Sequence, residues 1–319
     1  MSIQVAAAAI TPRVLNWLNR NAAATVLHVS SHTCNLVDPQ GDILSLVTPD
    51  IGRGPFALVV PVSGFKFQVS GFRVRVSSST PAASVQPPTA QSPHSPFTIH
   101  HSPFTIDPSP VSSPQSLNLS VSQSPCLSIP PYLITTDEAE LWEPRPRWDT
   151  IRPHLAKALP WLRLALLRHT PTHAAAIHQL PRFTSGIQTL CQCLKRQDET
   201  GITDATESLA GFGPGLTPAG DDGLMGVMYG VWATQAQPDE PLLSRVVAQA
   251  RKRTTTLSGA FLVAAAAGEA VQAWHELVRA IGEGEGEGVY AAAKGILAIG
   301  DSSGACALAG FMAMGETGR

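Results

Sequence analysis

Short apolar runs separated by turn residues characterise the first quarter of the chain. Glycine and proline clusters at 38–42 and 52–55 mark the turns between the runs. A helix is predicted before the first run, over Val14–Ala24. The spacing of the apolar runs and turns predicts a small antiparallel sheet or barrel. Its expected strands are Thr25–Val29, Ile43–Val47, Ala57–Val60, the alternating part of Phe65–Val76, and a returning strand at Tyr132–Thr135.

A serine- and proline-rich stretch, 77–125, interrupts this pattern. It has 14 serines and 10 prolines in 49 residues, and Asp107 is its one charged side chain. Such a composition buries too little apolar surface to offset the entropy of ordering, so we predict a disordered loop inside the β domain. A tandem repeat, 94–100 followed by 101–107, places histidines at 94, 100 and 101. Duplication explains these histidines better than a metal site does.

From Ile151 onward, the apolar residues follow a helical period. Leu155, Leu159 and Leu162 share one face, and Pro160 is expected to kink or restart that helix. The Gly/Glu segment 282–288 predicts a flexible turn. The expected fold is therefore α+β, with a small β domain over 1–140 and a mostly helical domain over 141–319. The other predicted helices are 183–194, Pro241–Arg253, Leu257–Ile281 and Val289–Ile299.

Composition narrows the class of protein. The chain is 44% hydrophobic and 14% charged, with a net charge of −2, which excludes a disordered chain and the basic surface of a nucleic-acid binder. It has no apolar run of about 18 residues, so no membrane span is predicted. The N-terminus has no basic residue before its apolar run, which argues against a secretion signal and favours the cytoplasm. The five scattered cysteines are typical of buried free thiols.

The segment Gly211–Asp222 is the strongest candidate for chemistry. Its glycines permit backbone conformations closed to other residues and let a ligand approach the main chain. Thr217 followed by Pro218 is a typical helix start, with a hydroxyl cap and a proline in the first turn. Free amides at such a start attract anions. We therefore expect an anion cradle shaped by Gly213, Gly215, Thr217 and Gly220.

Two adjacent acids, Asp221 and Asp222, follow within the first turn and a half of this helix. They are the candidate catalytic residues, because they could hold a cation, orient an amide or ammonium group, or act as a base. The alternative is a helix cap without function. Glycines at 223, 226 and 230 leave one helix face bare, which predicts close packing against another helix.

Two other predicted helix starts are rich in hydroxyls. At the first we expect Thr255, Thr256 and Ser258 to bind substrate, and at the second Ser302 and Ser303. Each start alone is explained by helix capping, but three such starts in one domain favour a common pocket. The sequence has no nucleotide-binding loop. The histidines at 169, 173 and 178 are interpreted as surface or core residues, and we expect no metal and no cofactor.

Gly-Pro-Gly-Leu-Thr-Pro-Ala-Gly-Asp-Asp, within Leu209–Leu224, resembles the signature of the bacterial AllH family. This family includes a subunit of oxamate carbamoyltransferase. The segments 26–36, 52–56, 254–262, 268–269 and 300–304 resemble other family stretches, so the resemblance extends over nearly the whole chain outside the Ser/Pro loop. It departs at Ala219, Asp301 and Cys306, where the family pattern has serine, histidine and aspartate.

The resemblance implies a carbamoyltransferase subunit that works with FdrA-like partner subunits. The small anionic substrates would be carbamoyl phosphate and oxamate or oxalurate, as in ureide breakdown during allantoin degradation. Two alternatives remain open. The first is a non-catalytic binding or scaffold subunit, which the departures at Asp301 and Cys306 favour. The second is a metal-dependent amidohydrolase, a hypothesis for which Asp221 and Asp222 are the only support.

Overall fold

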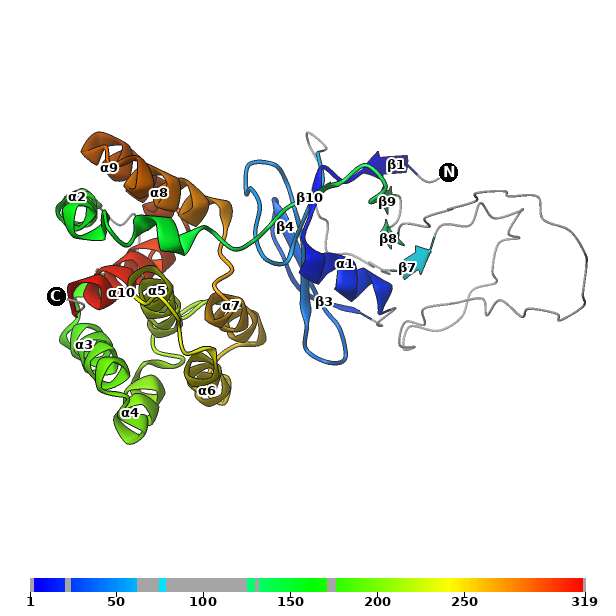
Figure 1. The fold of residues 1–319 in the computed structure, drawn as a ribbon. Helices are drawn as coiled ribbons and strands as arrows, with labels where there is room; N and C mark the ends of the chain where they lie inside the picture. Colours follow the sequence, from blue (N-terminus) through cyan, green and yellow to red (C-terminus); the bar gives the residue numbers. More distant parts are fainter. Residues whose placement is uncertain are drawn as a thin grey trace, which may run out of the picture. The chain divides into compact units, whose positions relative to one another are not determined.

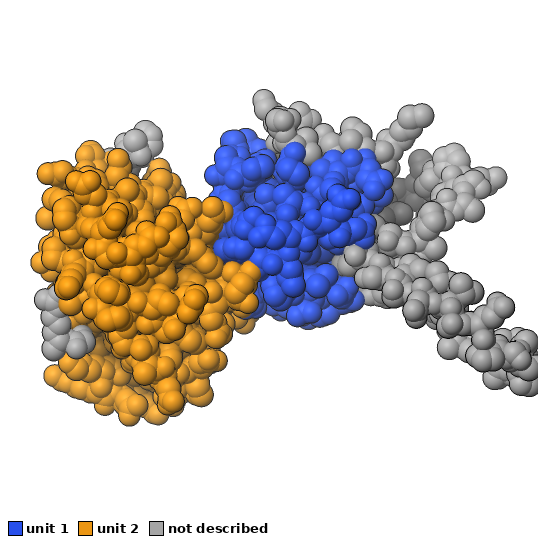
Figure 2. Space-filling view, turned by 45° about the horizontal axis from the view of Figure 1, so that its top comes forward, with its two compact units in different colours: residues 1–142 blue, residues 143–319 orange. Residues whose placement is uncertain are grey.

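The computed structural model of the chain describes residues 3–20, 24–61, 75–78, 125–129, 132–170 and 176–317. It divides into two compact units, residues 1–142 and residues 143–319 (Figure 2). The first is built mainly of strands and the second of helices, so the expected α+β class is confirmed. In the described part of the chain, no helix combines the length and apolarity that crossing a membrane requires.

The first unit contains two sheets. One has the strand order β1-β9-β8-β7, and the other has the order β10-β2-β6-β5-β4-β3. Neither sheet closes into a barrel. Three pairings are parallel, namely β1 with β9, β10 with β2, and β5 with β6, so the sheets are mixed and not purely antiparallel. The strands are β1 Ile3–Ala6, β2 Ala9–Ile10, β3 Thr25–Val29, β4 Thr33–Val37, β5 Ile43–Val47, β6 Ala57–Val59, β7 Arg75–Ser78, β8 Pro125–Ile129, β9 Tyr132–Thr135 and β10 Glu140–Leu141.

The chain passes from the first sheet to the second at the β1–β2 junction. The amide of Ala7 donates to Thr135 O at 2.8 Å in the first sheet, and that of Ala8 donates to Val59 O at 2.8 Å in the second. The β9–β10 segment makes the same transition, since β9 pairs with β1 and β10 with β2. The sequence did not predict β1, because Met1–Ile10 shows no clear alternation.

One helix, α1 (Pro12–Asn19), fills the core of this unit. Thr11 caps it by accepting the Val14 amide at 3.2 Å, and Pro12 occupies the first turn. Its buried side chains include Trp17 and Leu18, which pack with apolar residues of both sheets. The helix ends at Asn19, earlier than the predicted end at Ala24.

The predicted Ser/Pro loop lies largely outside the described residues. Ser77 and Ser78 belong to β7, and Pro125 begins β8. Residues 79–124, with the repeated histidines, are not among those described, and neither are residues 65–74 of the predicted strand Phe65–Val76.

The second unit is helical. Its two central helices, α5 and α10, lie side by side in Figure 1, with the other helices around them. Trp148, Tyr229, Trp274 and Phe311 form an aromatic cluster in its core. The elements are η1 Trp148–Ile151, α2 Leu155–Arg168, η2 Ile177–Gln179, α3 Pro181–Arg196, α4 Glu199–Leu209, α5 Ala219–Thr234, α6 Glu240–Ala250, α7 Thr256–Ala266, α8 Gln272–Glu283, α9 Gly286–Leu297 and α10 Ser303–Thr317.

Gly226 and Gly230 of α5 face α10, whereas a Cβ on Gly223 would lie 2.8 Å from Ile187 and Phe183 of α3. Close packing of this glycine face against another helix was predicted from the sequence. A Cβ on Gly226 would lie 1.9 Å from the carbonyl oxygen of Ala307, and a Cβ on Gly310 would lie 2.3 Å from that of Gly223. Side chains cannot occupy this contact. The two helices therefore meet backbone to backbone, and this fixes the position of the residues at their first turns.

Two details of the helix prediction were wrong. The single helix expected over Leu257–Ile281 is two helices, because Gly268 adopts a φ of 75° after α7. The amides of Gly268 and Glu269 then donate to the Ala265 and Ala264 carbonyls at 2.9 Å each, which closes the helix end. The turn expected over 282–288 is shorter, since α8 extends to Glu283 and α9 begins at Gly286. The helix α2 continues through Pro160, which excludes a restart there, and a kink at this proline remains a prediction.

Candidate functional site

The glycine-rich segment before α5 folds back on itself. Gly211, Gly213 and Gly215 have φ values of 71°, 105° and 104°, which other residues rarely adopt. The amide of Gly220 donates to Phe212 O at 2.8 Å. A Cβ on Gly220 would lie 1.9 Å from Leu209 O. These glycines therefore shape the turn and let α5 start against the end of α4.

Thr217 does not cap α5, contrary to our prediction. The cap position belongs to Pro218, whose carbonyl accepts the amides of Asp221 and Asp222 at 2.9 and 3.1 Å. Because the helix starts one residue later than expected, the Thr217 hydroxyl does not bond the first turn of α5 and can contact another element. It lies 3.0 Å from the Ser303 hydroxyl at the start of α10. This contact brings two of the three predicted helix starts together.

Asp221 holds this part of the unit together. It is 2% exposed. Its Oδ1 accepts the Gly211 amide at 3.0 Å, and its Oδ2 accepts the hydroxyls of Thr254 and, at 3.0 Å, Ser258. Burial raises the pKa of Asp221, and these three hydrogen bonds partly offset the rise. Asp221 thus joins the glycine turn, α5 and α7.

Asp222 has a different environment. It is 4% exposed, and its Oδ2 has no hydrogen-bond partner among the described residues. Burial raises its pKa to about 8, although hydrogen bonding to Ser303 and Thr217 lowers it, and the neighbouring Asp221 charge raises it further. A carboxyl with this pKa is mostly protonated at neutral pH.

The two acids therefore have different hydrogen-bond neighbours. Successive residues on an α-helix point about 100° apart, so Asp221 reaches towards α7 and Asp222 towards the start of α10. The sequence prediction gave them one shared role. The structure gives Asp221 a full set of partners and leaves Asp222 with unused hydrogen-bonding capacity.

Asp222 lines a cavity of about 200 Å³ in the helical unit. Met225 and Tyr229 lie three and seven residues further along α5, on the same helix face. The sequence shows this spacing, but our prediction of the site did not include Met225 and Tyr229. The lining residues from the other helices are not specified by any local pattern. The lining consists of Thr217, Asp222, Met225, Tyr229, Phe261, Val271, Trp274, Ile296, Ile299, Gly300, Ser303, Gly304 and Ala307.

The cavity contains three of the predicted site residues, namely Thr217, Asp222 and Ser303. Thr255 instead caps α7, where it accepts the Ser258 amide at 3.0 Å and donates to Leu216 O at 2.6 Å. Thr256 lies exposed in the first turn of α7. The other predicted residues are likewise not among the cavity's lining residues: Gly213, Gly215, Gly220, Asp221, Ser258 and Ser302. The anion cradle remains a prediction.

The cavity's chemistry differs from that of an anion site. Among its described lining residues there is no lysine, arginine or histidine, and aromatic and aliphatic side chains predominate. Its ionisable groups are the Asp222 carboxyl and the Tyr229 phenol. The phenol donates to Glu269 O at 3.1 Å, and burial raises its pKa. The polar end of the cavity is thus a carboxyl beside two hydroxyls.

Cys306 lies next to this site, at a position where the family resemblance implies aspartate. It is fully buried, and burial together with the nearby Asp222 charge raises the pKa of its thiol. Asp301 is exposed just before α10, and Ala219 is buried at the first position of α5. Of the three departures from the family pattern, Cys306 is therefore the one with an electrostatic connection to Asp222.

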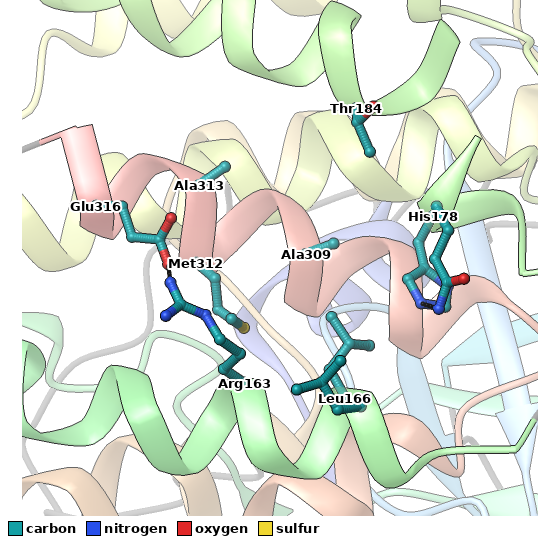
Figure 3. Close-up of a pocket in the computed structure, with 10 residues that line it drawn as sticks. Arg163, Leu166, His178, Thr184, Ala309, Met312, Ala313 and Glu316 are labelled. Atoms are coloured by element: carbon teal, nitrogen blue, oxygen red, sulfur yellow. Dashed lines mark hydrogen bonds and ion pairs between the residues drawn. The ribbon is translucent and has the colours of Figure 1, made fainter. Parts of the chain in front are cut away.

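A second, more open cavity of about 440 Å³ lies between α2, η2, α3 and α10 (Figure 3). Arg163 and Glu316 form an ion pair at one end, and His178 lies at the other. His178 is buried, and burial followed by the charge of His169 lowers its pKa. This supports a core histidine at 178, while His173 is outside the described residues. No group of three or more metal-binding side chains occurs in the described ranges.

Comparison with known proteins supports the family resemblance. The chain matches the family described as oxamate carbamoyltransferase subunit AllH over residues 209–314. No curated protein and no solved structure matches it. The matched region spans the glycine-rich segment, α5, α7 and most of α10, and it does not extend to the N-terminal segments 26–36 and 52–56. Residues 209–314, which contain Asp221, Asp222 and every lining residue of the 200 Å³ cavity, are thus similar to the AllH family.

Proposed function

We propose that this chain is the AllH-type subunit of an oxamate carbamoyltransferase system, and that Asp222 contacts the nitrogen-bearing substrate. The observation that carries the proposal is the position of Asp222. It is a buried carboxyl with unused hydrogen-bonding capacity, it lines a cavity, and it lies inside the family-matched segment. Strongly perturbed acids in cavities are typical of functional sites.

The pKa of Asp222 suits proton transfer near neutral pH. General acid–base catalysis is most efficient when the pKa of the group lies near the working pH, and that of Asp222 is raised to about 8. In the proposed reaction, the oxamate nitrogen attacks the carbamoyl carbon of carbamoyl phosphate. A C–N bond forms, and the C–O bond to phosphate breaks with its electron pair leaving on phosphate. The ionised form of Asp222 takes the proton released from nitrogen.

The described lining of the cavity does not provide cations for the phosphate and carboxylate groups of these substrates. Stabilising such anions in a buried site requires positive charge or several oriented amides. We therefore propose that partner subunits of the FdrA-like type complete the site. This accords with the family description, which names a subunit.

Reconstitution tests this proposal. The full chain would be co-purified with FdrA-like partners and assayed for carbamoyl transfer between carbamoyl phosphate and oxamate. Loss of general acid–base catalysis typically costs about 10²–10⁴-fold, so Asp222→Asn should lower kcat by at least about 100-fold. Asp204→Ala, which removes an exposed acid of α4, is the matched control and should retain full activity. Unchanged kcat in Asp222→Asn would contradict the proposal.

A second function has one specific observation in its favour. Cys306, beside Asp222, replaces the aspartate that the family pattern implies, so the chain could bind its ligand and partners without catalysing transfer. In that case the reconstituted complex would assemble and bind ligand but show no turnover. Turnover that depends on Asp222 would exclude this alternative.

A further inference from the structure

The walls of the Asp222 cavity indicate which ligands it can accept. Its largest side chains are aromatic or aliphatic, including Tyr229, Phe261 and Trp274. At its polar end, Asp222 lies beside the Thr217 and Ser303 hydroxyls. A charged ligand would lose its hydration on entering and would find no opposite charge among the described lining residues except an ionised Asp222.

We propose that the Asp222 cavity binds an uncharged molecule in which a primary amide is joined to an apolar body, with the amide on the carboxyl of Asp222. The inference goes beyond the proposed function: it concerns the same carboxyl, but it names an uncharged ligand that this chain binds by itself, without the partner subunits that would supply positive charge for oxamate. It predicts that the isolated chain prefers an amide to the corresponding carboxylate.

Hydrogen-bonding capacity favours the amide. A protonated carboxyl offers one donor and one acceptor side by side, and a primary amide offers the complementary acceptor and donor. The two groups can form two hydrogen bonds without burying a charge. A carboxylate ligand matches only the donor, and it would place a negative charge in a cavity whose described walls carry no cation.

Cavity size determines a suitable probe. An apolar cavity of about 150 Å³ accommodates benzene, and the Asp222 cavity measures about 200 Å³. Benzamide adds one amide group to that ring. Benzoate has nearly the same shape but carries a charge, and benzene lacks the polar group. These three molecules separate the contributions of shape, charge and hydrogen bonding.

The experiment measures binding of benzamide, benzoate and benzene to the full chain at pH 7 by ligand-observed NMR. Benzamide should bind at least about tenfold more tightly than either of the others, which corresponds to about 1.4 kcal/mol. In Asp222→Leu the advantage over benzene should disappear. Asp222→Asn keeps a donor and an acceptor at the same place and should retain benzamide binding within about threefold. Asp204→Ala should change nothing.

Two outcomes would overturn the inference: benzoate binding as tightly as benzamide, or benzamide binding that is the same in the Asp222→Leu variant. If Asp222→Leu does not fold, Ala307→Leu serves in its place, because it fills the cavity without altering the acid and should abolish binding of all three probes. Asp222→Asn separates this inference from the proposed function. It should keep benzamide binding but lose carbamoyl transfer. Loss of benzamide binding would therefore contradict this inference alone, and unchanged carbamoyl transfer would contradict the proposed function alone.

Discussion

Replacing Asp222 with asparagine should change how the stability of the protein depends on pH. The unfolded carboxyl has a pKa of 3.8, whereas burial raises the folded value to about 8. Between these values the folded state keeps a proton that the unfolded state has lost. The free energy of unfolding therefore falls as pH rises through this window, and the fall stops above pH 8, where the folded carboxyl ionises as well.

The size of the effect follows from the exchange of one proton. Each pH unit inside the window costs the folded wild type about 1.4 kcal/mol. Asparagine has nearly the same shape and does not titrate. The stability of Asp222→Asn relative to wild type should therefore increase by about 3 kcal/mol between pH 5 and pH 7.

Urea unfolding at pH 5, 6 and 7, followed by tryptophan fluorescence, measures this difference. Four of the six tryptophans, at 148, 161, 232 and 274, belong to the helical unit and report on its unfolding. Asp204→Asn is the control and should follow the wild type at each pH. If the difference between Asp222→Asn and wild type stayed constant with pH, Asp222 would ionise with an ordinary pKa, and our account of its burial would be refuted.

Two further predictions concern the scaffold around the site. Gly226→Ala should destabilise the protein by roughly 3 kcal/mol or more, because its Cβ would overlap the Ala307 carbonyl. Gly295→Ala, on α9 with nothing within 4 Å of the new Cβ, should stabilise the protein by about 1 kcal/mol through helix propensity. Chemical denaturation measures both variants, and two neutral results would contradict this packing argument. Ser258→Ala should lower the free energy of unfolding by about 2 kcal/mol at pH 7, because it removes a hydrogen bond to buried Asp221 that also lowers the pKa of this acid. A variant as stable as wild type would show that the bond contributes nothing.

The sequence predicted those features of the fold that depend on local periodicity. The strands at Thr25–Val29, Ile43–Val47 and Tyr132–Thr135 lie where alternation and turn residues placed them. The glycine face of α5 was also predicted, because three- and four-residue spacing defines one side of a helix. The parallel pairings of β1 and β10 depend on partners far along the chain, and no local pattern specifies them.

The candidate site was predicted in part, for a similar reason. The sequence selected Asp222, Thr217 and Ser303 from their positions near helix starts, and the structure brings these three together. It could not show that Asp221 and Asp222 face different helices, since that depends on where α7 and α10 pack. The apolar walls, including Trp274 and Ile296, come from helices whose patterns indicated only burial.

The backbone contact between α5 and α10 has a consequence for ligand selection. Side chains in most pockets can change rotamer to accommodate different molecules, but no side chain separates these two helices at Gly226 and Gly310. The distance between Asp222 and Ser303 is therefore set when the protein folds, and a ligand cannot adjust it by displacing flexible groups. The entropy of ordering this part of the cavity is lost during folding and not during binding, which favours tight selection of ligands that already fit.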